Sequence, residues 1–144
     1  MVYVRRDIQD KDLIQIVRDW IDVLSQKRYD VFFNALGYSM AGKCASADCI
    51  ASDLSRYRSE LYPGISDFAV TNWRTAKGGN PAPIAEVVWY KPNATRLAGA
   101  VTLTLPLNGK WSDATADFIL FETNTREGLW LRLEEICIPF RGEQ

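Results

Sequence analysis

The sequence of 144 residues predicts an α+β protein in which three N-terminal helices pack on a curved antiparallel β-sheet. The first half of the chain repeats apolar residues at spacings of three and four, which is typical of amphipathic helices. The second half alternates apolar and polar residues, which is typical of half-buried strands. One Asn-Gly pair, Asn108-Gly109, separates two β-forming runs and is a strong hairpin signal. The length predicts a single domain over residues 1–144.

Three helices are expected in order. The first covers residues 8–26, with Asp7 as its N-cap and an apolar stripe formed by Leu13, Ile16, Val17, Trp20, Ile21 and Leu24. The second is short, covers residues 29–36 and ends at Gly37. The third begins after Ser46 and presents Ile50, Leu54, Tyr57 and Leu61 on one side.

Strands follow at residues 67–73, 85–90 and 97–105. The two-residue turn at Asn108-Gly109 then starts a long strand at residue 110, and a connection at 122–127 leads to a last strand from residue 128. A two-residue loop fixes the register of a hairpin, so Leu103 is expected opposite Ala114.

The register of the last strand is chosen by burial, because a slip of one residue would turn its leucines outward. The register that keeps Leu129, Leu131 and Leu133 on the apolar side is chosen. It places Arg132 opposite Asp117 and Trp130 opposite Ile119. The other side of the sheet then presents Trp130 and Ile119 among threonines and charged residues. A surface of this kind often receives a partner subunit.

Composition excludes several classes of partner. With 17 basic and 18 acidic residues the net charge is −1, which offers no positive surface for nucleic acid or an anionic membrane. No stretch is long enough to span a membrane and no secretory signal is visible, so the expected location is the cytoplasm. The three cysteines predict no disulfide framework: Cys137 is expected in the core, and Cys44 and Cys49 flank a helix start.

The chain contains no histidine, which excludes Ser-His-Asp and Cys-His catalysis and histidine-ligated metals. No phosphate-binding loop and no metal-ligand spacing is present, so neither a cofactor nor a metal is predicted. An enzyme would need a carboxylate base and a phenolic donor in an apolar pocket. The candidate residues for that chemistry are Tyr29, Tyr57, Tyr62 and Tyr90 with Asp53, Asp113 and Asp117.

The order of helices and strands resembles the nuclear transport factor 2-like superfamily, also called SnoaL-like or cystatin-like. More narrowly, Gly109-Lys110-Trp111-Ser112-Asp113, with Thr115-Ala116 and Phe118, is similar to a bacterial branch of that superfamily of unknown function. The run from Gly128 to Ile136, GLWLRLEEI, is part of the same likeness. The narrower likeness covers only the last third of the chain.

The resemblance implies a cone-shaped pocket between the helices and the concave face of the sheet. Residues expected to line this pocket are Trp20, Phe33, Tyr57 and Phe118. If side chains such as Trp20, Phe33 and Phe118 filled the cone instead, the protein would have no such pocket. The resemblance also implies a homodimer through the outer face of the sheet, with a contact patch of Trp111, Asp113, Asp117, Ile119, Trp130 and Arg132.

Two roles are open for Trp111, Ser112 and Asp113. They can be structural, with the ring covering the end of the sheet and the polar side chains bonding to a bulge or loop. Alternatively, Trp111 and Asp113 belong to the contact patch with Arg132, since Trp and Arg are favoured interface anchors.

The expected function is a protein that binds a small apolar ligand or a protein partner without catalysis. A bacterial toxin system's immunity or accessory protein is one form of this expectation, by analogy with other proteins of the fold. The alternative is an Asp/Tyr isomerase, cyclase or dehydratase acting on a small apolar substrate, because the superfamily includes such enzymes and fold alone does not choose.

Overall fold

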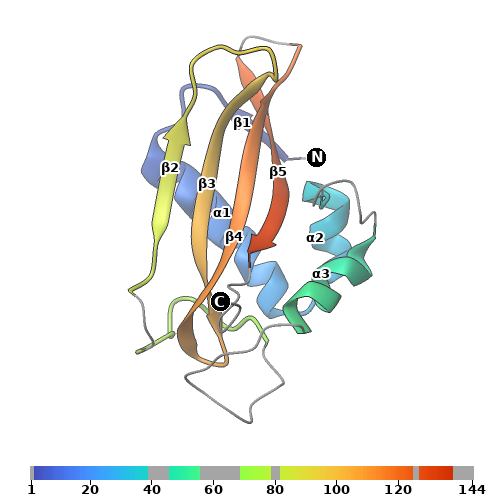
Figure 1. Cartoon of the computed structure of the whole chain (residues 1–144), viewed down its shortest axis with the longest axis vertical. Helices are drawn as coiled ribbons and strands as arrows, with labels where there is room; N and C mark the ends of the chain where they lie inside the picture. The colour runs from blue at the N-terminus through green and yellow to red at the C-terminus, as the bar shows by residue number, and fades with distance from the viewer. Residues whose placement is uncertain (1, 39–45, 56–68, 79–81, 125–126, 138–144) are drawn as a thin grey trace, which may run out of the picture.

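The structure, a computed structural model, describes residues 2–38, 46–55, 69–78, 82–124 and 127–137. In this part of the chain three helices, α1 (Asp10–Ser25), α2 (Tyr29–Leu36) and α3 (Ala47–Ser55), precede most of the sheet. The sheet has five antiparallel strands: β1 (Val2–Arg5), β2 (Ala85–Trp89), β3 (Leu97–Leu107), β4 (Lys110–Glu122) and β5 (Gly128–Cys137). Their spatial order is β1-β5-β4-β3-β2 (Figure 1). The predicted α+β arrangement of N-terminal helices on a curved antiparallel sheet is confirmed.

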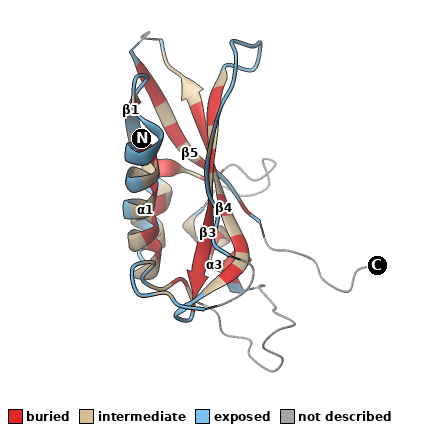
Figure 2. Ribbon diagram, turned by 90° about the vertical axis from the view of Figure 1, so that its left-hand side faces the viewer, coloured by how far each residue is buried: buried red, intermediate tan, exposed pale blue. Residues whose placement is uncertain are grey.

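Helix α1 lies along one face of the sheet (Figure 2). Its buried residues Leu13, Val17, Ile21 and Leu24 follow the predicted stripe and meet the inward side chains of the strands. Helices α2 and α3 lie beside the C-terminal half of β5, beyond the part that pairs with β1 (Figure 1). No helix among the described residues lies across the opposite face, which we call the outer face (Figures 1 and 2).

The helix ends partly follow prediction. Gly37 ends α2 with a φ of 70°, a conformation that favours glycine, and its N–H donates to the carbonyl of Phe33 at 2.7 Å. The prediction that Asp7 caps α1 is wrong. Gln9 occupies the N-cap position without a side-chain hydrogen bond, and the Asp7 carboxylate pairs with Arg5 instead. Residues 56–62 of the third predicted helix lie outside the described residues.

One predicted strand is wrong and one observed strand was not predicted. Residues 69–73 form only an isolated bridge, Val70 with Leu107, because the chain turns at Asn72, whose side-chain oxygen accepts from the N–H of Arg74. The fifth strand is instead β1, which pairs Val2 with Leu131 and Val4 with Leu129.

The hairpin between β3 and β4 has the predicted turn, with Asn108 and Gly109 at φ values of 51° and 82°. Its register is as predicted only beside the turn. Past Pro106 and Trp111 the ladder resumes at Thr104 with Thr115. This irregularity moves the partner of Leu103 from the predicted Ala114 to Ala116.

The Ser112 hydroxyl holds this irregularity together. It donates to the carbonyl of Leu105 at 2.7 Å and accepts from the N–H of Ala114 at 3.1 Å. The structural role expected of Ser112 is therefore confirmed. Because the register moves by two positions along β4, every side chain keeps its predicted face.

The predicted register between β4 and β5 is also wrong by two positions. Arg132 lies opposite Ile119, Trp130 lies opposite Phe121, and Asp117 lies opposite Glu135. The longer connection leaves this register free of any turn constraint. The leucines of β5 stay inward in both registers, so burial alone does not separate them.

Candidate functional site

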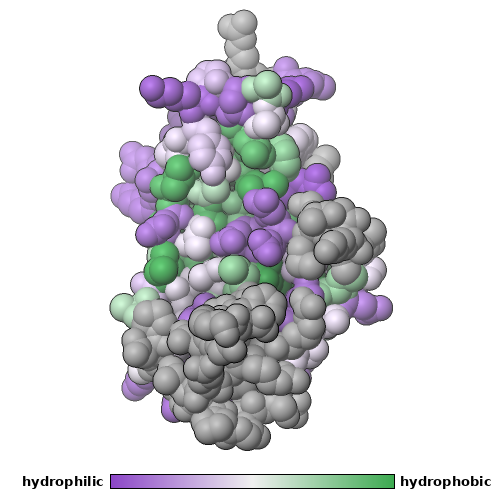
Figure 3. All heavy atoms as spheres, in the orientation of Figure 1, coloured by the Kyte–Doolittle hydropathy of each residue, from purple (hydrophilic) through white to green (hydrophobic). Residues whose placement is uncertain are grey.

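The outer face of the sheet carries a cluster of aromatic and apolar side chains. Strand alternation brings together Tyr3 from β1, Ile119 and Phe121 from β4, and Trp130 and Arg132 from β5, and we call this set the aromatic face. Figure 3 shows this side of the molecule, where hydrophobic side chains gather in the upper half among charged ones.

The aromatic face is held by ring contacts. The rings of Tyr3 and Trp130 meet edge to face, with centroids 5.7 Å apart and an interplanar angle of 77°. The guanidinium carbon of Arg132 lies 5.8 Å from the centroid of the Phe121 ring. Tyr3 remains 49% exposed, while Ile119 is buried among its neighbours. The face thus offers preformed aromatic surface together with one cation.

An acidic region borders the aromatic face along β4 and β5. Burial raises the pKa of Asp117 above its usual value, against the hydrogen bonds from Thr102 and Thr115 that lower it. Its cross-strand neighbour is Glu135, so two carboxyl groups share this part of the sheet. Burial, with the charges of Asp117 and Glu135, also raises the pKa of the Cys137 thiol.

Four members of the predicted contact patch share the outer face: Asp117, Ile119, Trp130 and Arg132. Trp111 and Asp113 lie apart from them at the hairpin end of β4, where Trp111 pairs with Pro106. Sequence reasoning missed Tyr3 and Phe121. Phe121 has the same strand parity as Ile119 and could have been found, whereas Tyr3 required knowledge of β1.

The predicted pocket residues lie in and beside the core between helices and sheet. The ring of Phe32 contacts Trp20 on one side and Phe118 on the other, at centroid distances of 6.2 Å and 6.3 Å. Phe32 and Phe118 have no exposed surface, and Phe33 is half-buried beside them. Tyr57 lies outside the described residues.

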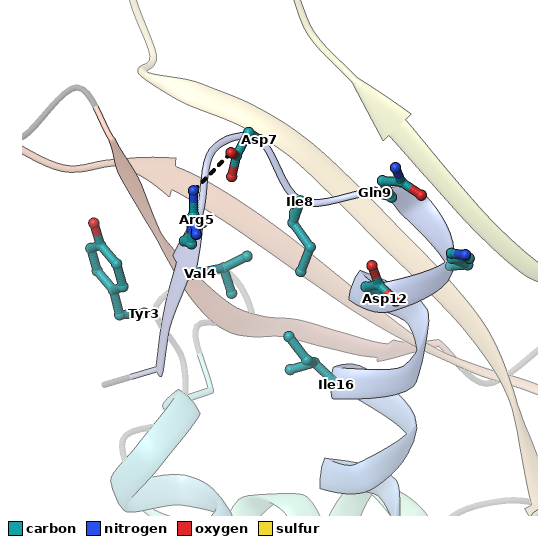
Figure 4. A pocket seen from close by; sticks show the side chains of 9 residues that line it. Tyr3, Val4, Arg5, Asp7, Ile8, Gln9, Asp12 and Ile16 are labelled. Carbon is teal, nitrogen blue, oxygen red and sulfur yellow. Dashed lines mark hydrogen bonds and ion pairs between the residues drawn. The ribbon is translucent and has the colours of Figure 1, made fainter.

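A groove of about 660 Å³ runs between β1 and the first turns of α1 (Figure 4). Its floor is apolar, with Val4, Ile8 and Ile16. Its rim is charged with both signs and includes Arg5 and Asp7, paired at 2.9 Å, with Gln9, Lys11 and Asp12. The groove lies between a helix and the sheet, as the resemblance implies for a pocket, but different residues line it.

Tyr38 and Asp53 form a buried acid–base pair at the junction of α2, α3 and β5. The Tyr38 hydroxyl donates to the Asp53 carboxylate at 2.6 Å and accepts from the N–H of Ile136 at 3.3 Å. Burial, followed by the hydrogen bond to Asp53, raises the pKa of Tyr38 far above its usual value. The phenol therefore stays protonated at neutral pH and ties three elements together.

Only part of the predicted catalytic set is brought together. Asp53 was a candidate carboxylate, but its partner Tyr38 was not among the candidate tyrosines. Tyr29 is partly buried, which raises its pKa, and Tyr90 is exposed near the end of β2. Asp113 and Asp117 lie on β4, where Asp117 is opposite Glu135, the neighbour of Ile136, and Tyr62 lies outside the described residues.

The cysteines differ from prediction. Cys49 is disulfide-bonded, and Cys137 carries an exposed free thiol instead of a core one. The sequence holds one other cysteine, Cys44, outside the described residues. Disulfides persist mainly in oxidising compartments, so this bond is a departure from the pattern expected of a cytoplasmic chain.

Two features are absent from the described residues. The helices found there include none that combines the length and apolar character needed to cross a membrane. The same part of the chain groups no three Cys, Asp or Glu side chains suitably for a metal ion. No family model, curated protein or solved structure matches the chain.

Proposed function

We propose that this chain is a nuclear transport factor 2-like interaction module that binds a protein partner without catalysis. Its first partner is a second copy of itself, which contacts the aromatic face. The proposal rests on one observation: Tyr3, Phe121 and Trp130 gather on a sheet face that no described helix crosses, and Arg132 lies between them and the end of α2 at Gly37.

The chemistry of the aromatic face suits a protein interface. Aromatic residues and arginine are enriched at the centres of such interfaces, because each combines a large apolar area with a polar group. Arg132 already lies over the ring of Phe121, and Tyr3 already packs on Trp130, so little side-chain freedom would be lost on binding. A contact here would cover the half-exposed ring of Tyr3.

The described interior gives less support to a small apolar ligand. The ring of Phe32 contacts the rings of Trp20 and Phe118 in the core between helices and sheet, where the resemblance implies a cavity. The groove between β1 and α1 has a charged rim, which suits a polar ligand better than an apolar one.

The isomerase, cyclase or dehydratase alternative also receives less support. Such an enzyme needs a carboxylate and a phenol that both reach a substrate. The buried pair Tyr38 and Asp53 bond to each other, and the raised pKa of Tyr38 makes its phenol a poor proton donor near neutral pH.

Variants of the aromatic face test the proposal. Trp130→Glu and Tyr3→Glu each place a charge in the face, and light scattering after size exclusion measures the molar mass of each variant. Gln15→Glu is the matched control, because it adds the same charge on α1, which lies on the other face of the sheet. Far-ultraviolet circular dichroism checks that each variant folds.

We expect the parent and Gln15→Glu to have the same mass, above that of a monomer, and both face variants to have a lower mass. Two variants are used because Trp130 is partly buried, while Tyr3 is half-exposed and its substitution is better tolerated. An unchanged mass in folded Tyr3→Glu and Trp130→Glu would exclude the aromatic face as the contact.

A further inference from the structure

Strand β2 is the last strand of the sheet on the side away from β1, and it pairs only with β3 among the described residues. The Thr104 N–H donates to the Ile84 carbonyl and the Tyr90 N–H donates to the Ala98 carbonyl. In an antiparallel pair such residues alternate with residues whose backbone groups point away. The N–H and C=O groups of Ala85, Val87 and Trp89 therefore point outward from the sheet edge.

The side chains of this edge are unusual for an exposed strand. Ile84, Val88, Trp89 and Tyr90 are 40%, 49%, 39% and 46% exposed. Glu86 is the only charged residue from Ile84 to Tyr90. Edge strands are normally protected by charges, prolines or bulges, and a regular apolar edge is a template for another strand. Proline and lysine occur only at the flanks, as Pro83 and Lys91.

We infer that β2 pairs antiparallel with β2 of a second copy, joining the two sheets edge to edge. The outward backbone groups must form the hydrogen-bonded pairs of the new ladder, which restricts the register to alternatives that differ by two residues. The register centred on Val87 is the one that uses Ala85, Val87 and Trp89 together. Val87 then lies opposite the partner's Val87, and Ala85 lies opposite the partner's Trp89. On the outer face Glu86 lies opposite the partner's Val88, and Ile84 lies opposite the partner's Tyr90.

This register makes the strand complementary to itself, which is why a second copy is the occupant. The small side chain of Ala85 leaves room for the large ring of Trp89, and Ile84 meets an aromatic ring. The two Glu86 carboxylates are not directly opposed. A two-fold axis through Val87 repeats every one of these contacts, as an isologous interface requires.

This contact goes beyond the proposed use of the aromatic face, because it uses backbone groups at the rim of the sheet instead of side chains above it. The two contacts do not compete for the same atoms. If both form, the parent assembles beyond a dimer, and removal of either contact leaves the other.

The experiment compares Val88→Glu with Val88→Lys by sedimentation velocity over a range of protein concentrations. Val88 is half-exposed on the outer face, so neither substitution disturbs the core. In the inferred register Val88→Glu opposes two carboxylates across the interface, while Val88→Lys pairs with the partner's Glu86. We expect Val88→Glu to raise the dissociation constant about tenfold or more and Val88→Lys to retain association.

Two further variants test the charge pair and the backbone ladder separately. Glu86→Lys combined with Val88→Glu restores an attractive pair and should restore association. Val87→Pro removes an N–H that points away from β3, so it leaves the internal ladder intact and blocks only the new one. Equal masses for Val88→Glu, Val87→Pro and the parent would overturn the inference.

The outcomes separate this inference from the proposed function. Loss of mass in Val88→Glu and Val87→Pro but not in Trp130→Glu would support the β2 contact and exclude the aromatic face. A lower measured mass in Trp130→Glu alone would support the aromatic face and exclude the β2 contact. A parent that stays monomeric would overturn both.

Discussion

The ring of Tyr3 lies over Gly128, in the place where any other residue would put its β-carbon. The two residues come from β1 and β5, which pair Arg5 with Gly128 and Tyr3 with Trp130. Gly128 thus lets the Tyr3 ring close against Trp130 and anchors the first strand to the sheet. This relationship explains why a glycine begins β5 at a position that is buried.

Gly128→Ala should therefore displace the Tyr3 ring and destabilise the fold by about 1 kcal/mol, the size of a lost aromatic contact. Urea unfolding measures this difference. In a Tyr3→Ala background the same substitution should cost much less, because no ring remains to be displaced. Equal costs in the two backgrounds would show that the ring does not occupy this place.

The hydrogen bond between Tyr38 and Asp53 is expected to stabilise the packing of α2 and α3 against β5. Tyr38→Phe keeps the ring but removes the hydroxyl, leaving a buried carboxylate short of one donor. We expect a loss of about 1–3 kcal/mol in the free energy of unfolding. Ser52→Ala, on the exposed side of α3, is the control and should change stability little.

The same pair predicts a dependence on alkaline pH. The folded-state pKa of Tyr38 lies above its usual value of 10.0, so folding favours the protonated phenol. Its contribution is fully present below the unfolded-state pKa and is lost as pH rises above it. The stability advantage of the parent over Tyr38→Phe should be constant below about pH 9 and should shrink as pH rises from 10.0 toward about pH 12. A constant advantage across that range would contradict the raised pKa.

Asp117 and Glu135 are expected to repel each other, because they are cross-strand neighbours. Asp117→Asn and Glu135→Gln should each stabilise the fold by about 0.2–1 kcal/mol, and the double variant should gain less than the sum. The gain from Asp117→Asn should disappear below about pH 3.8, where the unfolded carboxyl is itself protonated.

Substitutions of Asp117 and Arg132, by contrast, should have additive effects on stability. Arg132 lies opposite Ile119 and over Phe121, not opposite Asp117. Chemical denaturation of the two single variants and the double variant measures this. A coupling between them would instead support the predicted register, in which Arg132 is opposite Asp117.

The cysteines predict a simple thiol count. Cys137 is free and Cys49 is disulfide-bonded, so the partner of Cys49 is Cys44 or a cysteine of another molecule. Denatured but unreduced protein should react with a thiol reagent at Cys137 alone when Cys44 is the partner of Cys49, and at Cys44 as well when it is not. Prior reduction should expose the remaining cysteines. Mass spectrometry without reductant shows whether the bond lies within one chain. Full reactivity before reduction would exclude the disulfide.

Hydrophobic patterning predicts which face each strand side chain takes, and it does so correctly for Leu103, Leu131 and Arg132. It cannot separate registers that differ by two positions, because both bury the same residues. The irregularity between Thr104 and Pro106 decides one register, and it depends on the Ser112 hydroxyl bridging Leu105 and Ala114. Such a bond is visible only in three dimensions.

The two misjudged strands have the same cause. Strand β1 is four residues long, too short for alternation to be distinctive, and it exists because Val2 and Val4 pair with Leu131 and Leu129. Residues 69–73 have the composition of a strand, yet they form a single bridge, Val70 with Leu107, flanked by backbone hydrogen bonds of Ala69 and Thr71. Tertiary pairing decides both cases. The aromatic face was accordingly predicted from Ile119, Trp130 and Arg132, but without Tyr3 and Phe121.

Sedimentation velocity of the unmodified protein, over a wide range of concentrations, tests the central claim most directly. A chain that associates through the aromatic face should sediment with a mass above 16.3 kDa, and this mass should fall on dilution or in Trp130→Glu. A single species of 16.3 kDa at every concentration would contradict self-association and leave the exposed aromatic face without its proposed partner.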